Sequence, residues 1–514
     1  MKALPPHPVS CSMLVAIVCF GIFYAVRLFD YGYIHGDEGI ALMGGWRIFL
    51  GQIPYRDFFE FLPPFSFLLL AGFFKIFGPG FFAERLLVMV YAALLIFVSD
   101  RLLCHFTKKI LPRCLVASFL IPYGVLQWPL PSHHWVVDIV QILALSCLIC
   151  GLYRSSWRWG LYAGIYTSLG CFSMQDQGGY LVVALIILFF PLIESREARA
   201  KLFLGWVVGG GLIAVIFALY LLPYVSLSEL IYQWVVFPAT RYSNVEGNVG
   251  ALSNLGLQEI GTPGWIAYLR KYPDYTIPQT CIAVLLPLLP FMGVAVVGLE
   301  LGKRPHEKPL IGLLVAGGIA FMGGCLHRFA QTNLVWAAPM LIIILAVGVG
   351  SLLEYGGKWQ RIGAQAFSVV MIGLSLLYAA GNLRLKMMGT VNTRVSGPAG
   401  TLIVPAHSPQ SSMQIVIDSI EENIPKGAPL FCTEYNAMIN FWALRQNPTR
   451  YNFFITPSLH TNEQVDEVIN SLDNRPESYV LLFVPFAEND RFGDIISKKY
   501  QVVWRFPWAL LLKK

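Results

Sequence analysis

Long apolar stretches alternate with short polar loops from the start of the chain to about residue 383. A helix needs about 20 apolar residues to cross the hydrocarbon core of a bilayer, with a range of about 17–25. Eleven stretches reach or approach this length: residues 11–29, 82–104, 114–131, 134–152, 159–173, 180–194, 202–224, 277–299, 310–325, 333–352 and 364–383. The pattern predicts a polytopic α-helical membrane protein with about 11–13 transmembrane helices.

Cationic side chains indicate how these helices are oriented. Lysines and arginines gather in every second short loop: Lys108, Lys109 and Arg113; Arg154 and Arg158; Arg196, Arg199 and Lys201; Lys303, Arg304 and Lys308; Lys358 and Arg361. The alternate short loops, near residues 132–134, 174–179 and 326–332, contain Arg328 as their one lysine or arginine. Since positive loops stay on the cytoplasmic side, we expect the tail beyond residue 384 to lie outside.

The beginning of the chain must agree with this orientation. The stretch 11–29 has no convincing small-residue cleavage site, which predicts an uncleaved anchor rather than a removed signal peptide. With the N-terminus inside, residues 30–63 form an external loop, and one net crossing fits before the basic loop at 105–113. We therefore expect the shorter apolar stretch 64–78 to lie in the membrane plane or to re-enter, with 82–104 as the true span.

Residues 384–514 differ in kind from residues 1–383. They contain 25 charged residues, 13 basic and 12 acidic, against 42 in the longer first part. Helical periodicity over 412–423 and 462–472 and strand-like apolar runs at 428–432, 479–485 and 500–505 predict a small α/β domain. The predicted organisation is a transmembrane domain over 1–383 and an extracytoplasmic α/β domain over 384–514.

Composition excludes the main soluble classes. The 514 residues are 56% hydrophobic and 13% charged, with a mean hydropathy of +0.60, whereas a soluble domain has about 25% charged residues. This excludes a disordered chain, a coiled coil and a soluble nucleic-acid-binding protein. The formal charge of +7 comes from the basic loops, so we expect no nucleic-acid partner. Most cysteines lie in or beside apolar stretches, which argues against a disulfide framework.

The predicted external loop 30–63 contains the most informative residues. Asp37 and Glu38 lie next to each other just beyond the first span, and an amphipathic segment over 40–50 follows them. A carboxylate at the depth of the lipid headgroups is partly desolvated, which raises its pKa and suits it to act as a general base. The alternative is a solvated loop with ordinary surface acids.

Together the motifs of this region resemble the start of the GT-C superfamily of membrane glycosyltransferases. The nearest relatives in pattern are bacterial relatives of protein O-mannosyltransferase and lipid A aminoarabinose transferase. The motifs follow each other in the order of that family: an acidic pair, a tyrosine-aspartate turn, a double proline and a following arginine. The residues that carry them are Asp37-Glu38, Gly51-x-x-Pro54-Tyr55-x-Asp57, Pro63-Pro64, Phe77-Gly78 and Glu84-Arg85. The external C-terminal domain also fits the plan of the family.

The resemblance implies an inverting glycosyltransferase. It would move a hexosyl or pentosyl group from a polyprenyl-phosphate donor to a lipid, glycan or protein acceptor on the external face of a bacterial-type inner membrane. Asp37 occupies the place of the presumed base or acceptor-positioning group, and Glu38 that of its neighbouring acid. The expected partners are this donor, the acceptor and membrane lipids. The chemistry requires no bound cofactor, and the sequence leaves open whether it uses a divalent cation.

The sequence departs from the family at two positions. Some relatives have a lysine or histidine directly before the double proline, where this chain has Leu62, and aromatic residues often follow their acidic motif, where this chain has Gly39. The first departure leaves open which cation binds the donor phosphate. Arg56 and Arg328 are the leading candidates because a guanidinium forms paired hydrogen bonds with phosphate; further cations of the predicted external loop 225–276 are Arg241, Arg270 and Lys271.

Other polar residues have both a functional and a structural interpretation. Asp138 is an intramembrane acid, which is functional by default, and Asp176 can bind sugar hydroxyls or simply form a polar turn. His133 and His134 are expected to cap a helix rather than to bind a metal. We expect Arg85 to pair with Glu84 or another acid. The candidate substrate-binding residues are Tyr55, Arg56, Asp57, Asp138, Asp176 and Arg328, with no metal ligands.

Three other kinds of protein remain open. A lipid-linked glycan polymerase or ligase of a different fold would share the membrane and the substrate class. A transporter would show paired halves and broken helices, and no such repeat is seen in the sequence. A membrane scaffold whose external domain binds a partner is opposed only by the motifs of the first loop.

Overall fold

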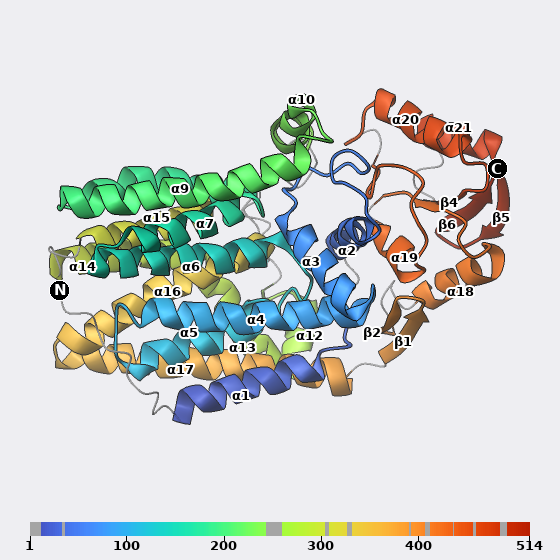
Figure 1. The fold of residues 1–514 in the computed structure, drawn as a ribbon. Coiled ribbons are helices and arrows are strands. Elements are labelled where there is room, and N and C mark those ends of the chain that lie inside the picture. The colour runs from blue at the N-terminus through green and yellow to red at the C-terminus, as the bar shows by residue number, and fades with distance from the viewer. Residues whose placement is uncertain are drawn as a thin grey trace.

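The computed structural model describes residues 12–32, 36–242, 260–303, 308–325, 331–389, 392–406, 412–434, 436–455, 459–483 and 491–514. Long helices run back and forth along one axis, and the strands gather at one end of this bundle (Figure 1). Helices α2 and α3 lie between the bundle and the C-terminal elements (Figure 1).

Each apolar stretch predicted to cross the membrane contains a helix. Among the described residues, seven helical segments are long and apolar enough to span: Phe81–Leu103, His133–Arg154, Gln175–Leu192, Arg196–Leu221, Pro273–Glu300, Asn333–Tyr355 and Lys358–Met387. They contain α4, α6, α8, α9, α13 with α14, α16 and α17. Shorter apolar helices are α1 (Ser12–Arg27), α3 (Phe65–Phe77), α5 (Ile110–Tyr123) and α15 (Lys308–Gly323). The prediction of a polytopic α-helical membrane protein is confirmed.

One predicted span ends earlier than its apolar stretch. The stretch 114–131 was expected to be helical throughout, but α5 ends at Tyr123. Pro122 lies in its last turn, and Gly124 has φ −102° and ψ −144°, outside the helical region. The residues that follow Tyr123 form turns. The prediction was too long here because hydropathy reports burial and does not register where a proline ends a helix.

Glycines bring α7 (Trp157–Cys171) and α9 directly together. Gly160 and Gly164 lie one helical turn apart on α7, and Gly205 and Gly209 are spaced in the same way on α9. A β-carbon at any of the four would collide with backbone atoms of the opposite helix. Small residues four apart let two helices approach closely where lipid supplies no hydrophobic driving force.

The amphipathic segment of the first loop forms α2 (Gly36–Phe49). An amphipathic helix at the depth of the lipid headgroups would leave one face exposed, yet the middle residues of α2, from Leu42 to Arg47, are buried. Trp46 packs edge-on against Phe441 of α19 (Ala437–Trp442), while Phe49 packs against Phe74 of α3. The C-terminal domain therefore covers the face that we assigned to lipid headgroups.

The C-terminal part is the predicted α/β unit. Strands β1 (Asn392–Gly397) and β2 (Gly400–Pro405) form an antiparallel hairpin. A four-stranded mixed sheet has the order β3-β4-β6-β5, with strands Leu430–Cys432, Tyr479–Phe483, Ala509–Lys513 and Gln501–Arg505. Helices α18 (Met413–Asn423), α20 (Asn462–Asp473) and α21 (Arg491–Lys499) accompany it. The predicted helices and strands of this region are present; β1, β2, β6, α19 and α21 were not anticipated.

The first loop and the C-terminal part are joined by backbone hydrogen bonds. Gly32 N donates to Ile403 O at 2.9 Å, and Phe59 N donates to Arg450 O at 2.7 Å. Phe81 N, at the start of α4, donates to Ala399 O at 2.9 Å. These bonds make the loop part of the same layer as the C-terminal domain, and the division of the chain at residues 383 and 384 stays a prediction.

Candidate functional site

The two acids of the first loop lie in the first turn of α2. Asp37 is exposed, whereas the Glu38 side chain is only 1% exposed. A helix N-terminus favours negative charge, and successive helical residues point in different directions. The same turn therefore presents one carboxylate outward and directs the other into the protein.

Glu38 belongs to a buried ionic cluster with Arg85 and Glu84. Arg85 Nη2 donates to Glu38 Oε1 at 2.7 Å, and Arg85 Nη1 donates to Glu84 Oε1 at 3.2 Å and also to Pro129 O. The expected ion pair between Arg85 and Glu84 is confirmed, and Glu38 is a second partner that sequence reasoning did not name. A guanidinium that bridges two carboxylates fixes the start of α2 against α4.

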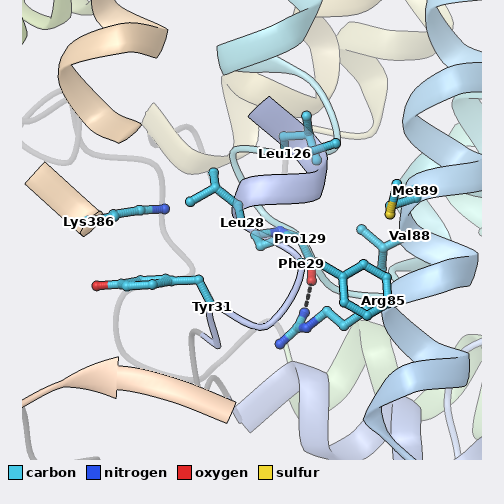
Figure 2. A pocket seen from close by; sticks show the side chains of 10 residues that line it. Leu28, Phe29, Tyr31, Arg85, Val88, Met89, Leu126, Pro129 and Lys386 are labelled. Atoms are coloured by element: carbon cyan, nitrogen blue, oxygen red, sulfur yellow. Dashed lines mark hydrogen bonds between the residues drawn. The ribbon is translucent and has the colours of Figure 1, made fainter. Parts of the chain in front are cut away.

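An apolar pocket opens beside this cluster, and we call it the α1–α4 pocket (Figure 2). Its walls come from the end of α1, from α4 and from the segment after α5, and the lining residues are Ala25, Leu28, Phe29, Tyr31, Arg85, Val88, Met89, Leu126, Pro129 and Lys386. Lys386 and Arg85 reach into it from opposite sides (Figure 2). The pocket thus combines apolar membrane-helix walls with two cations.

Lys386 is the cation of this pocket that lacks a carboxylate. Its ammonium lies 5.2 Å from the centroid of the Tyr31 ring, and it forms no ion pair with any residue that the structure describes. Arg85, in contrast, is already bound by two carboxylates. Of the two cations, Lys386 is thus the one whose ammonium is not already paired with a described carboxylate and can turn to a bound anion.

Glu60 is a further buried acid near Asp37. Its Oε1 accepts hydrogen bonds from the backbone N–H groups of Phe61 at 3.0 Å and Leu62 at 3.2 Å. Its Oε2 is buried and has no hydrogen-bond partner among the described residues. Burial raises the pKa of Glu60 to about 8, and the negative charge of Asp37 adds to this increase. Glu60 is therefore mainly protonated at neutral pH.

The tyrosine-aspartate turn stabilises the loop itself. Tyr55 has a φ of +69° and is buried, and its hydroxyl donates to Leu62 O at 2.7 Å. Asp57 Oδ2 accepts from Ile53 N at 2.7 Å and pairs with Arg56 at 2.7 Å. The Arg56 guanidinium also lies 5.3 Å from the centroid of the Tyr224 ring. All three candidate residues make contacts within the turn, and their roles in substrate binding stay predictions.

Asp138 and Asp176 lie at one polar centre organised by Gln177. Asp138 is fully buried, and its Oδ1 accepts from Gln177 Nε2 at 2.9 Å. Asp176 Oδ1 accepts from Gln177 N at 2.7 Å.

The start of α6 is capped by Ser132, whose hydroxyl oxygen accepts a hydrogen bond from His134 N. The His134 ring stacks on Trp336 with a centroid distance of 3.6 Å. Ser132, and not either histidine, therefore caps α6, and the two histidines are the first residues of the helix.

Two expectations concern cations and metals. Arg328 lies outside the described residues, so its place at the donor phosphate stays a prediction. In the part of the chain that the structure describes, no group of three or more His, Cys, Asp or Glu side chains is arranged to hold a metal ion.

Sequence reasoning did not identify three residues of this region as site residues: Lys386, Glu60 and Gln177. Lys386 follows the last apolar stretch and reads as an ordinary flanking charge. Glu60 reads in the sequence as one more acid of the first loop, and Gln177 carries no charge to attract attention. Each gains its meaning from a neighbour distant in sequence, which periodicity does not reveal.

The apolar helices of the bundle, with the first loop and the C-terminal α/β unit at one end, define an integral multi-pass membrane protein. Two crystal structures of ArnT from Cupriavidus metallidurans share this fold. The apo structure matches with a TM-score of 0.63 and 14% identity, covering 97% of each chain. The structure bound to undecaprenyl phosphate matches with a TM-score of 0.57 and 12% identity, covering 98% of each chain. No protein-family profile and no curated protein sequence matches the chain.

Proposed function

We propose that this protein is an inverting glycosyltransferase that moves a sugar from a polyprenyl-phosphate donor to an acceptor of the cell envelope. The observation that carries the proposal is the α1–α4 pocket, which places Arg85 and Lys386 at apolar helix walls beside the acidic first turn of α2. An isoprenyl phosphate combines an apolar chain with an anionic head, and the apolar walls and two cations of the pocket match these two parts in kind. The pocket has a volume of about 20 Å³, so the donor can enter only when the helices that line it move apart. The ArnT fold, one example of which was crystallised with undecaprenyl phosphate, supports the same ligand class.

In this proposal Lys386 and Arg85 hold the donor phosphate. Lys386 supplies a charge that pairs with no carboxylate of the described residues, and Arg85 is held in place by Glu38 and Glu84. When the bond between the anomeric carbon and the phosphate oxygen breaks, the electron pair leaves with the phosphate. A fixed cation near that oxygen stabilises the developing charge. Arg56 and Arg328 keep their phosphate-side roles as predictions from sequence.

Asp37 acts as the base or orienting group. An acceptor hydroxyl attacks the anomeric carbon from the face opposite the phosphate, the new carbon–oxygen bond forms, and Asp37 takes the hydroxyl proton. Asp37 is the exposed acid of the turn and is open to an acceptor, whereas Glu38 is held by Arg85. The role of Glu38 is therefore to position the turn. A single displacement of this kind inverts the sugar.

Charge asymmetry supports a site on the external face of a bacterial-type inner membrane. The helices alternate in direction along the bundle, so the loops that begin α5 and α17 lie at the end opposite the C-terminal strands (Figure 1). Those loops carry the lysines and arginines expected on the cytoplasmic side. The C-terminal domain and the first turn of α2 then lie outside, where the domain contributes to acceptor choice.

A transfer assay tests the proposal. Purified full-length protein in lipid nanodiscs is given labelled polyprenyl-phosphate sugars and envelope extract, and wild type is compared with three variants. Asp37→Asn should lower the rate of transfer by about 10² or more, as expected for loss of a general base. Lys386→Ala should raise the donor KM by about tenfold, the loss of one charged phosphate contact. Lys75→Ala, on an exposed side chain at the end of α3, is the matched control and should behave as wild type.

The outcomes separate the proposal from its rivals. Transfer by wild type with full activity in Asp37→Asn would assign the base elsewhere and overturn this site. Donor consumption by wild type with an unchanged donor KM in Lys386→Ala would remove the phosphate site. If wild type consumes no donor with any extract, a transporter or a polymerase or ligase of another kind becomes the better description.

A further inference from the structure

A second pocket lies between the first loop and the C-terminal domain. It has a volume of about 340 Å³, within the range of small-molecule sites. Residues 47–57 of the first loop form one side, and residues 447–450 together with Arg475 form the other. The lining is polar and includes three arginines and a single carboxylate, Asp57. We call it the arginine pocket.

Two of the three guanidinium groups have no carboxylate partner among the described residues. Asp57 is already paired with Arg56 at 2.7 Å. Arg450 is paired with Glu229 at 2.9 Å and lies 3.8 Å from Glu467. Arg47 and Arg475 are therefore the cations of the pocket that no described carboxylate pairs with. Because Arg450 has two carboxylate neighbours, the surroundings of the pocket carry a small net positive charge, which attracts an anion and disfavours a cation.

The two excess cations differ in how they are held. Arg47 is buried and donates four hydrogen bonds. Its Nε donates to Gln52 Oε1 at 2.6 Å, its Nη1 to Asn452 Oδ1 at 3.0 Å, and its Nη2 to the backbone carbonyls of Asp57 and Thr449. Burial lowers the pKa of Arg47 to about 9; the negative charge of Asp57 opposes this decrease, and the positive charges of Arg475 and Arg450 add to it. Arg47 therefore remains charged at neutral pH and gives the pocket a fixed positive wall.

Arg475, in contrast, is free to move toward a ligand. Its side chain is exposed, and no hydrogen bond or ion pair engages its guanidinium within the described chain. A fixed cation facing a mobile arginine suits an oxyanion, because a guanidinium donates two parallel hydrogen bonds to phosphate or carboxylate. The rest of the lining supplies amide and hydroxyl groups suited to sugar hydroxyls, as in Gln52 and Thr449.

The arginine pocket is distinct from the proposed transfer site. Arg47 follows Asp37 by ten residues on α2, which separates them by about 15 Å along the helix axis at 1.5 Å per residue. This distance exceeds one sugar ring. A ligand in the arginine pocket would therefore reach Asp37 through an extended saccharide and not with the same sugar.

We propose that the arginine pocket binds an acidic saccharide, a sugar that carries a phosphate or a carboxylate, as the recognition element of the acceptor. The assignment to the acceptor rests on the proposed function; the binding itself does not. The pocket is formed by the first loop and the C-terminal domain together, so recognition depends on the contact between them.

Binding measurements without any donor test this proposal separately from the transferase reaction. Full-length protein in phosphatidylcholine nanodiscs is titrated calorimetrically with glucose 6-phosphate, glucuronate, inorganic phosphate and glucose. We expect saturable binding of glucose 6-phosphate or glucuronate, weakened by salt, and no saturable binding of glucose. Arg475→Ala should weaken this binding at least about tenfold. Arg505→Ala, an exposed arginine on β5, is the matched control and should bind as wild type.

Three results would overturn the proposal. Absence of saturable binding of both anionic sugars to wild type removes the site. Unchanged affinity in Arg475→Ala places any binding elsewhere. Inorganic phosphate that binds as tightly as glucose 6-phosphate, with no binding of glucuronate, would show that the saccharide is not recognised. None of these results bears on whether the chain transfers sugars.

Discussion

The guanidinium of Arg85 donates to the carboxylate of Glu38 at 2.7 Å and joins the first turn of α2 to the start of α4. The two residues lie 47 positions apart, and their side chains are 4% and 1% exposed. This contact fixes the acidic motif of the loop onto a membrane helix. Asp37, one residue earlier, owes its position to the same contact.

Removal of Arg85 should destabilise the protein strongly. Arg85→Ala leaves the buried carboxylates of Glu38 and Glu84 without their guanidinium, and breaking a buried pair in this way costs about 3–5 kcal/mol. The free energy of unfolding, measured by denaturant titration in detergent, should fall by this amount. Arg101→Ala removes an arginine that is 43% exposed and pairs with Asp100, and it should cost no more than about 1 kcal/mol. Equal losses in the two variants would contradict a buried ionic cluster.

Glu60 should make stability depend on pH. Its pKa is about 8 in the folded protein, against about 4.3 in an unfolded chain. The folded state therefore binds the proton more tightly, and its extra stability is complete below about pH 4 and is lost as pH rises through 8. We expect the thermal midpoint to fall as pH is raised from 5 to 8.5.

The variant Glu60→Gln isolates this effect. Glutamine keeps the size of the protonated side chain but does not ionise, so the variant should match wild type near pH 4 and exceed it in stability increasingly as pH rises to 8.5. Glu477→Gln, at an exposed position, should follow the wild-type curve throughout. Parallel curves for wild type and Glu60→Gln would mean that Glu60 is ionised in the folded protein across this range.

Hydropathy predicts the helical bundle because the bilayer imposes a length and an apolar surface on every span. It fails where backbone geometry decides, as at Pro122 and Gly124, where α5 ends inside its apolar stretch. In the C-terminal domain, apolar residues at helical spacing reveal the amphipathic helices α18 and α20. Strand β6, whose sequence Ala-Leu-Leu-Leu-Lys lacks alternation, becomes a strand because β4 and β5 pair with it on both sides.

The candidate site was predictable only as far as its residues are adjacent in sequence. The acidic pair and the tyrosine-aspartate turn are local patterns, and the turn is formed. The contacts of Glu38 with Arg85, of Asp138 with Gln177 and of Lys386 with Tyr31 join distant segments. Tertiary packing alone decides which of several arginines and lysines faces an anion, so composition could name Arg56 but not Lys386.

Arg47 should connect the first loop to the C-terminal domain. It donates to Asn452 Oδ1 at 3.0 Å and to Thr449 O at 3.0 Å across the contact between the two parts. Arg47→Ala leaves these buried acceptors unsatisfied, at about 1–3 kcal/mol each. Hydrogen exchange should therefore accelerate in residues 447–455. Arg47→Lys should not restore protection, because an ammonium lacks the planar fork that reaches both partners; Arg394→Ala, exposed on β1, should leave exchange unchanged.

Gly39 should be intolerant of any side chain, which accounts for the absence of an aromatic residue after the acidic pair. A β-carbon at Gly39 would lie 2.8 Å from Met438 Cα and closer still to its backbone N, where α2 meets α19. Gly39→Ala should cost about 1–3 kcal/mol of unfolding free energy through overpacking, despite the gain in helix propensity. Gly72→Ala on α3, where a β-carbon meets nothing within 4 Å, supplies the propensity gain alone and should raise stability by up to about 1 kcal/mol.

The same substitution at Gly39 should also lower the transfer rate. Because Gly39 follows Glu38 directly, the clash would shift the first turn of α2, so the rate should fall in Gly39→Ala and not in Gly72→Ala. Stabilisation by both alanines to the same extent would show that the C-terminal domain does not press on this turn.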